Sequence, residues 1–183
     1  MVAEHGGLSI YFTSGRTVRC DWDEDFDLLA EAVAPTVAYG RQRGVIAALE
    51  PTTRTASSFV TTLADAIDVA ERTGLGLVAD FANVWTERGL PQTIRRAAPY
   101  VALWQIDDIV IGGPGRPTPG GRAHIGEGEL PLERFMQNVL DTGYNGPFDL
   151  EVVAADFTQP IDEAELRRGI AAASKLLDEM GIK

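Results

Sequence analysis

Oxygen-bearing side chains recur where predicted strands end. Glu50, Asp80, Gln105 and Glu151 each lie at or near the C-terminal end of a different apolar run. In a parallel sheet these ends emerge on one face, which is where barrels and open α/β sheets bind their ligands. Any one of these residues also fits a helix cap or a solvated loop. Their repetition predicts a site of hard oxygen ligands, which suits Mg²⁺ or Mn²⁺ and not copper or iron–sulfur chemistry.

Strands and helices alternate along the chain. The β-branched and apolar runs predict strands over Leu8–Thr13, Val45–Leu49, Leu75–Ala79, Tyr100–Ile106 and Phe148–Val153. Helical spacing predicts helices over Asp23–Arg43, Ser57–Arg72, Leu90–Ala98, Pro131–Thr142 and Ile161–Met180. Connections this short require βαβ units, so we predict an α/β fold with a parallel sheet, as one domain over residues 1–183.

Two segments interrupt this pattern. Pro35 falls inside the first predicted helix, which is therefore either kinked there or begins afresh around it. The Gly- and Pro-rich segment Gly112–Gly121 is long enough to be a functional loop.

The charge balance excludes several classes of partner. The 183 residues include 16 Lys and Arg against 27 Asp and Glu, for a formal net charge of −11. Such a surplus of acid repels phosphate backbones and anionic lipid, so we expect neither a nucleic acid nor a membrane as partner. The segment Met1–Gly7 lacks the basic and apolar stretches of a secretory signal. We therefore expect a cytoplasmic protein.

Six short motifs stand out along the chain: ALEP at Ala48–Pro51, VADFANVW at Val78–Trp85, WQIDD at Trp104–Asp108, GRAHIGEGELPL at Gly121–Leu132, GYNG at Gly143–Gly146 and FDLEVV at Phe148–Val153. In order and spacing they resemble the motifs of the sugar phosphate isomerase/epimerase family. This family has a xylose-isomerase-like (βα)₈ TIM barrel and includes ketose 3-epimerases, inosose dehydratases and, more distantly, apurinic endonucleases. The resemblance runs from about Leu8 to Val153.

The resemblance implies a ligand set. In this family the last four barrel strands each supply one metal ligand, in the order Glu, Asp, His, Glu. It implies Glu50, Asp80 and Glu151 as ligands, with Gln105 in the third position, as in members similar to inosose dehydratase. Glu50 and Glu151 are then also the catalytic base and acid. The endonuclease branch is disfavoured, because its metal site resembles a histidine-rich cluster and this chain has 2 His.

Further residues are candidates for substrate binding. Asn83 stands where many relatives carry a His; it can hydrogen-bond a hydroxyl but cannot carry a proton at neutral pH. Arg122 matches an Arg that binds substrate oxygens in ketose epimerases, although a mobile surface Arg is an equal alternative. His124 fits either a substrate contact or a solvated position in the loop. Trp85 fits either a substrate contact or a position in the core. Asp108 is a candidate because its spacing from Gln105 resembles the third-strand motif of the family.

The implied chemistry is proton transfer next to a carbonyl. A divalent ion would chelate a carbonyl and an adjacent hydroxyl and lower the energy of the enediolate that forms when a neighbouring C–H proton leaves. The leading hypothesis is thus a metal-dependent isomerase or epimerase of a sugar or polyol. The alternatives are a dehydratase or lyase of the inosose dehydratase type, and a non-catalytic truncated paralogue that acts as a binding or assembly subunit.

The length predicts only part of a barrel. A complete (βα)₈ barrel takes about 250 residues, and the five predicted strands begin at what resembles the fourth, so the N-terminal βα units are expected to be missing. Open sheet edges and an uncovered interior favour association. We therefore expect a homo-oligomer, or a partner chain that covers the open edges.

Overall fold

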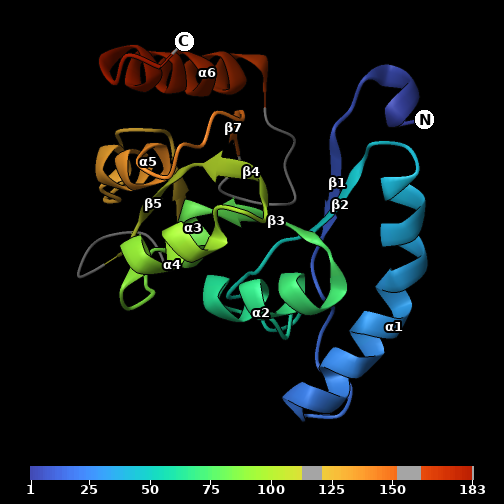
Figure 1. Ribbon diagram of the computed structural model, residues 1–183. Helices are drawn as coiled ribbons and strands as arrows, with labels where there is room; N and C mark the ends of the chain where they lie inside the picture. The colour runs from blue at the N-terminus through green and yellow to red at the C-terminus, as the bar shows by residue number, and fades with distance from the viewer. Residues whose placement is uncertain (113–120, 152–161, 183) are drawn as a thin grey trace.

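The computed structural model describes residues 1–112, 121–151 and 162–182 (Figure 1). Its main sheet has the strand order β1-β2-β3-β4-β7, and every neighbouring pair in it is parallel. These strands are β1 (Ser9–Phe12), β2 (Ile46–Leu49), β3 (Gly76–Asp80), β4 (Val101–Ile106) and β7 (Phe148–Leu150). The predicted α/β class, with five parallel strands that form part of a TIM barrel, is confirmed.

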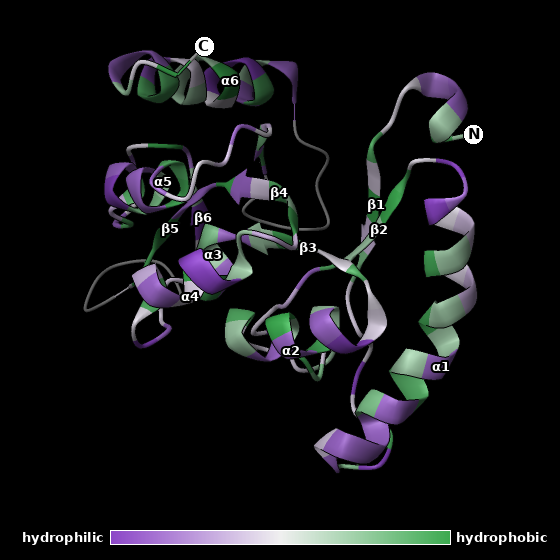
Figure 2. Ribbon diagram, viewed as in Figure 1, coloured by the Kyte–Doolittle hydropathy of each residue, from purple (hydrophilic) through white to green (hydrophobic). Residues whose placement is uncertain are grey.

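Helices surround the sheet on its outer side (Figure 1). After a 3₁₀ turn at Ala3–His5, the helices are α1 (Trp22–Arg41), α2 (Leu63–Thr73), α3 (Phe81–Val84), α4 (Leu90–Ala97), α5 (Leu132–Leu140) and α6 (Glu163–Glu179). Hydrophilic and hydrophobic bands alternate along α1 and α6 (Figure 2), as expected for helices with one apolar face. Among the described residues, no helix has the length and apolar character needed to cross a bilayer.

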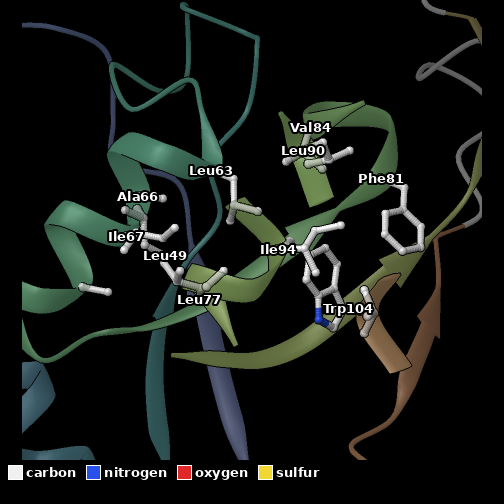
Figure 3. Packing of buried hydrophobic residues seen from close by; sticks show 14 of the residues in the cluster. Leu49, Leu63, Ala66, Ile67, Leu77, Phe81, Val84, Leu90, Ile94 and Trp104 are labelled. Carbon is white, nitrogen blue, oxygen red and sulfur yellow. The ribbon is translucent and has the colours of Figure 1, made fainter. Parts of the chain in front are cut away.

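The core lies between the sheet and these helices. Leu49 and Leu77, on neighbouring strands, are fully buried in one hydrophobic cluster with Leu63 and Ile67 of α2 (Figure 3). Farther along the sheet, Trp104 stacks on Phe81 with ring centroids 5.3 Å apart. Because side chains alternate between the two faces of a strand, this packing leaves every second residue to the barrel interior.

The second helix begins later than its periodicity predicts. It was expected from Ser57, but α2 starts at Leu63, after Thr62 accepts a hydrogen bond from Asp65 N at 3.0 Å. The preceding residues are held elsewhere, since Phe59 N and Val60 N both donate to Ser14 Oγ. These bonds, with the bridge between Gly15 and Ser58, hold this segment beside the Ser14 loop in a non-helical conformation.

Pro35 does not divide the first helix: α1 runs continuously from Trp22 to Arg41 with Pro35 inside it. Between β4 and α5 the chain adds an antiparallel pair, β5 (Asp108–Val110) and β6 (Gly121–Ala123), that the strand pattern did not predict. Most of the expected functional loop, residues 113–120, lies outside the described residues, as do Val152 and Val153 at the end of the last predicted strand.

Candidate metal and substrate site

Three carboxylates lie close together at the C-terminal ends of three strands. Glu50 directly follows β2, Asp80 is the last residue of β3, and Glu151 directly follows β7. The two glutamates remain tied to the sheet, because Glu50 N donates to Phe12 O at 2.9 Å and Glu151 N donates to Ile106 O at 3.1 Å. Each of the three residues offers a carboxylate oxygen within 4.8 Å of the others.

Asn83 donates hydrogen bonds to two carboxylates of this cluster. Its Nδ2 donates to Asp80 Oδ2 at 2.8 Å and to Glu50 Oε1 at 3.2 Å. Asp80 caps the short helix α3 by accepting from Ala82 N at 2.9 Å, so the turn itself carries Asn83 back over the carboxylates. The buried Thr52 hydroxyl donates to Asn83 Oδ1 at 3.1 Å, which fixes the amide with its nitrogen toward the acids.

Arg122 brings a positive charge into the same cluster from β6. Its Nη2 lies 2.8 Å from Asp80 Oδ2 and 3.5 Å from Glu151 Oε2, and its Nη1 pairs with Asp107. Asp107 also accepts a hydrogen bond from Ala82 N at 3.1 Å. The Arg122 side chain is 9% exposed and that of Asp80 is 0% exposed, so water screens this pair little.

The crowding of acids changes how they titrate. Burial, followed by the charges of Asp80 and Glu151, raises the pKa of Glu50 from 4.5 to about 7, against the opposing effect of Arg122. Burial is also the main cause that raises the pKa of Glu151, and again Arg122 opposes it. Each buried carboxylate disfavours ionisation of its neighbours, so an additional positive charge would stabilise the ionised form of the cluster.

Gln105 lies on the strand next to Asp80, beside this cluster. In the sheet register it lies opposite Asp80 of β3 on one side and Asp149 of β7 on the other. Its Nε2 donates to Asp149 Oδ2 at 3.2 Å and contacts Tyr11 Oη at 3.3 Å. Its Oε1 is buried and has no hydrogen-bond partner among the described residues, and the same holds for Glu151 Oε2.

These donors fit a hard divalent cation. Buried polar oxygens normally have a partner. Beside the three clustered carboxylates, Gln105 Oε1 has none among the described residues, and Glu151 Oε2 has only the Arg122 guanidinium at 3.5 Å. A set made of oxygen alone suits Mg²⁺ or Mn²⁺. Glu50, Asp80, Gln105 and Glu151 are thus the residues that could hold the ion.

Three of the five predicted substrate-binding residues line a cavity beside this cluster. The cavity measures about 290 Å³, and Asn83, Trp85 and Arg122 are among its lining residues, together with Arg54. It therefore joins the polar cluster to an apolar surface, which is the usual composition of a small-molecule site.

Two other predicted residues have different surroundings. The Asp108 carboxylate accepts hydrogen bonds from four backbone amides of its own hairpin region, those of Ile109, Gly126, Gly128 and Leu130, at 2.9 to 3.1 Å. His124 Nε2 lies 2.5 Å from Glu165 Oε2 of α6. The Asp108 oxygens therefore bind the backbone of a loop, and His124 contacts the last helix. Neither residue lines the cavity beside Trp85.

Sequence reasoning missed four residues around the site: Tyr11, Thr52, Asp107 and Asp149. Strand alternation could have found two of them. Asp107 lies two positions after Gln105, and Asp149 lies two positions before Glu151, so each shares the inward face with a predicted ligand. Tyr11 and Thr52 carry no comparable signal, because their contacts depend on how distant segments pack.

Comparison with solved structures supports this fold over nearly the whole chain. A protein from Sinorhizobium meliloti superposes with a TM-score of 0.79 at 24% identity, covering 98% of this chain and 66% of that one. D-psicose 3-epimerase from Clostridium cellulolyticum, solved with D-tagatose, gives 0.76 at 18% identity, covering 100% and 67%. The chain therefore spans about two thirds of the length of these structures.

A third similar structure holds a metal. The protein named IOLI, solved with a bound zinc atom, gives a TM-score of 0.73 at 15% identity and covers 98% of this chain and 66% of its own. No curated protein shows significant sequence similarity to the chain. The family model described as xylose isomerase-like TIM barrel matches residues 2–179. With the half-barrel and its acidic strand ends in place, this match over almost the full length shows that the chain belongs to the xylose isomerase-like TIM barrel family.

Proposed function

We propose that this protein is a divalent-metal-dependent isomerase or epimerase of a sugar or polyol. The observation that carries the proposal is the convergence of Glu50, Asp80 and Glu151, whose oxygens lie within 4.8 Å of one another at the strand ends. The family supports it, since one similarly folded structure is a D-psicose 3-epimerase. The neutral oxygen of Gln105, left without a hydrogen-bond partner, completes a set of four ligand residues.

Mn²⁺ or Mg²⁺ is the proposed cofactor. When bound, it would supply Lewis-acid stabilisation of the negative charge that develops on a substrate oxygen. The similar structure with zinc shows a metal in the same fold. Among the described residues, the clustered ligand atoms are all oxygens, which favours the harder ions here.

The protein's own side chains would carry out the proton transfer. Glu50 and Glu151 approach the cluster from different strands, so one can remove a proton from a substrate carbon while the other returns it. Such positioned acid–base catalysis typically contributes about 10²–10⁴-fold. Asn83 and Arg122 would bind substrate oxygens, and Trp85 would cover an apolar face of the sugar, since all three line the adjoining cavity.

Metal titration tests the first step. Saturating Mn²⁺ should raise the melting temperature by mass action. In Glu151→Ala this rise should be lost, whereas Glu133→Ala, an exposed glutamate on α5 outside the cluster, should keep it. If no divalent ion among Mn²⁺, Mg²⁺ and Zn²⁺ shifts the melting temperature of the wild type, the metal site and the enzyme proposal are both wrong.

Proton exchange tests the second step. The protein with Mn²⁺ should catalyse deuterium uptake from D₂O next to the carbonyl of a responsive ketose in a panel followed by NMR. Glu50→Gln and Glu151→Gln should abolish it. Exchange followed by loss of a β-hydroxyl would identify the dehydratase chemistry instead. Tight metal binding without exchange on any ketose or inosose tested would favour a non-catalytic binding subunit.

A further inference from the structure

The Gln105 side chain is held by two residues outside the proposed ligand set. Its Nε2 donates to Asp149 Oδ2 at 3.2 Å and lies 3.3 Å from Tyr11 Oη. Asp149 sits opposite Gln105 across the β4–β7 pair, whereas Tyr11 comes from β1, 94 residues earlier in the chain. Two distant strands thus converge on one amide group.

The chemistry of these partners fixes which way the amide faces. An ionised carboxylate can only accept hydrogen bonds, so the nitrogen of Gln105, and not its oxygen, must face Asp149. The tyrosine hydroxyl can accept the second N–H. Gln105 Oε1 is consequently turned away from Asp149, and it is buried without a hydrogen-bond partner among the described residues. Leaving a buried carbonyl unpaired is unfavourable, so Gln105 Oε1 needs a partner from outside the described residues, and a bound cation would supply one.

We propose that Asp149, assisted by Tyr11, is a positioning residue that holds Gln105 Oε1 toward the metal cluster. The proposal rests on the metal site proposed above and adds the group that orients its one neutral ligand. A half-turn of the amide would exchange oxygen for an NH₂ group, which cannot bind a cation. Asp149 therefore acts through Gln105, by making the wrong orientation repulsive.

Replacing Asp149 by Asn removes this discrimination. An asparagine can donate or accept, so either orientation of Gln105 finds a partner. We expect Asp149→Asn to weaken Mn²⁺ binding about 10- to 100-fold, the range seen when groups that orient metal ligands are changed. Tyr11→Phe should have a smaller effect, because it leaves the carboxylate in place. Isothermal titration calorimetry with MnCl₂ measures both without any substrate.

A surface pair provides a matched control. Gln137 Nε2 donates to Asp141 Oδ1 at 2.7 Å on exposed positions at the end of α5, so it repeats the same chemistry away from the cluster. Asp141→Asn should leave Mn²⁺ affinity unchanged. It controls for the loss of one negative charge from the protein as a whole.

A double variant separates orientation from charge and structure. In Gln105→Glu the ligand is a carboxylate, which presents an oxygen in either orientation. In that background Asp149→Asn should cause no loss of Mn²⁺ affinity, and it should increase affinity if it relieves repulsion between the two acids. An equal loss in both backgrounds, or no loss in the wild-type background, would overturn the positioning role. If the wild type itself fails to bind Mn²⁺, both the proposed metal site and this positioning role are wrong.

Discussion

Arg122 Nη2 lies 2.8 Å from Asp80 Oδ2, so a guanidinium is paired with one of the three clustered acids. Both side chains are buried, and Glu151 Oε2 is 3.5 Å from the same nitrogen. Arg122 thus supplies positive charge that these carboxylates need when no metal is bound. A bound metal ion would compete with Arg122 for these carboxylates and should release it in part. The released guanidinium would then be available for its proposed role as a substrate ligand.

The first prediction concerns this ion pair. Arg122→Met should lower the free energy of unfolding of the metal-free protein by about 3–5 kcal/mol, because it leaves Asp80 and Asp107 buried without their cation. Saturating Mn²⁺ should restore much of the loss, so the metal-induced gain in stability should exceed that of the wild type. Urea unfolding with and without MnCl₂ measures both effects.

The control for this prediction is an exposed pair. Arg167 and Glu163 on α6 form an ion pair with both side chains 75% exposed. Arg167→Met should therefore change stability by less than about 1 kcal/mol. If Arg122→Met proved as stable as Arg167→Met, Arg122 would not be the cation that compensates the cluster.

The second prediction is a pH dependence from Glu50. Its pKa rises from 4.5 to about 7 on folding, chiefly through burial. The folded state therefore binds more protons than the unfolded state between these values, and the stability of the metal-free protein should fall as pH rises through this window. Mn²⁺ must displace the proton, so its affinity should rise with pH and level off above about 7.

Melting temperatures across this pH range, with and without Mn²⁺, test the prediction. Glu50→Gln removes the titrating group and should flatten the decline of metal-free stability. It should also weaken Mn²⁺ binding at every pH. A wild-type profile as flat as that of Glu50→Gln would show that Glu50 does not titrate in this window.

The third prediction separates two adjacent aspartates. Asp108 accepts four backbone hydrogen bonds while being 2% exposed, so Asp108→Ala should lower the free energy of unfolding by about 3 kcal/mol or more. Its carboxylate binds a loop, so the folded fraction should keep the Mn²⁺ affinity of the wild type. Chemical denaturation and calorimetry give the two values. A normal stability combined with weakened Mn²⁺ binding would restore Asp108 to the site.

The sequence predicts the strand ends well because their pattern is local. Val45–Leu49 is a short apolar run followed at once by Glu50, and the parallel sheet then dictates that Glu50 and Asp80 emerge on the same face. Period-two alternation extends this reasoning to Gln105 and Glu151. The positions of these groups follow from backbone geometry alone, without knowledge of any tertiary contact.

Other features depend on contacts between distant segments. The start of α2 is decided by Ser14, whose hydroxyl takes two amides more than 40 positions along the chain. The choice between Asp107 and Asp108 depends on the hairpin of β5 and β6, which turns Asp107 toward Arg122 and Asp108 toward backbone amides. No periodicity in the sequence distinguishes these two neighbouring acids.

The last prediction concerns the uncovered side of the half-barrel. Within the described residues β1 pairs with β2 alone, so its outer edge presents unpaired backbone groups. Nearby apolar side chains are exposed, with Leu8 at 69%, Ile10 at 39% and Ile46 at 45%, and hydrophobic colour marks parts of both strands in Figure 2. An open edge of this kind favours pairing with another chain. We therefore predict that copies of this chain associate through β1.

Sedimentation velocity over a range of protein concentrations should show a species larger than 19.7 kDa. Ile10→Lys should shift this species toward the monomer, because a charge on an edge strand opposes strand pairing. Val18→Lys places the same charge on a side chain that is 70% exposed but outside the sheet, so it should leave association unchanged. A monomer at every concentration would mean that the β1 edge is tolerated in water without a partner copy. Equal dissociation by Val18→Lys would instead trace the effect to total charge and not to the edge.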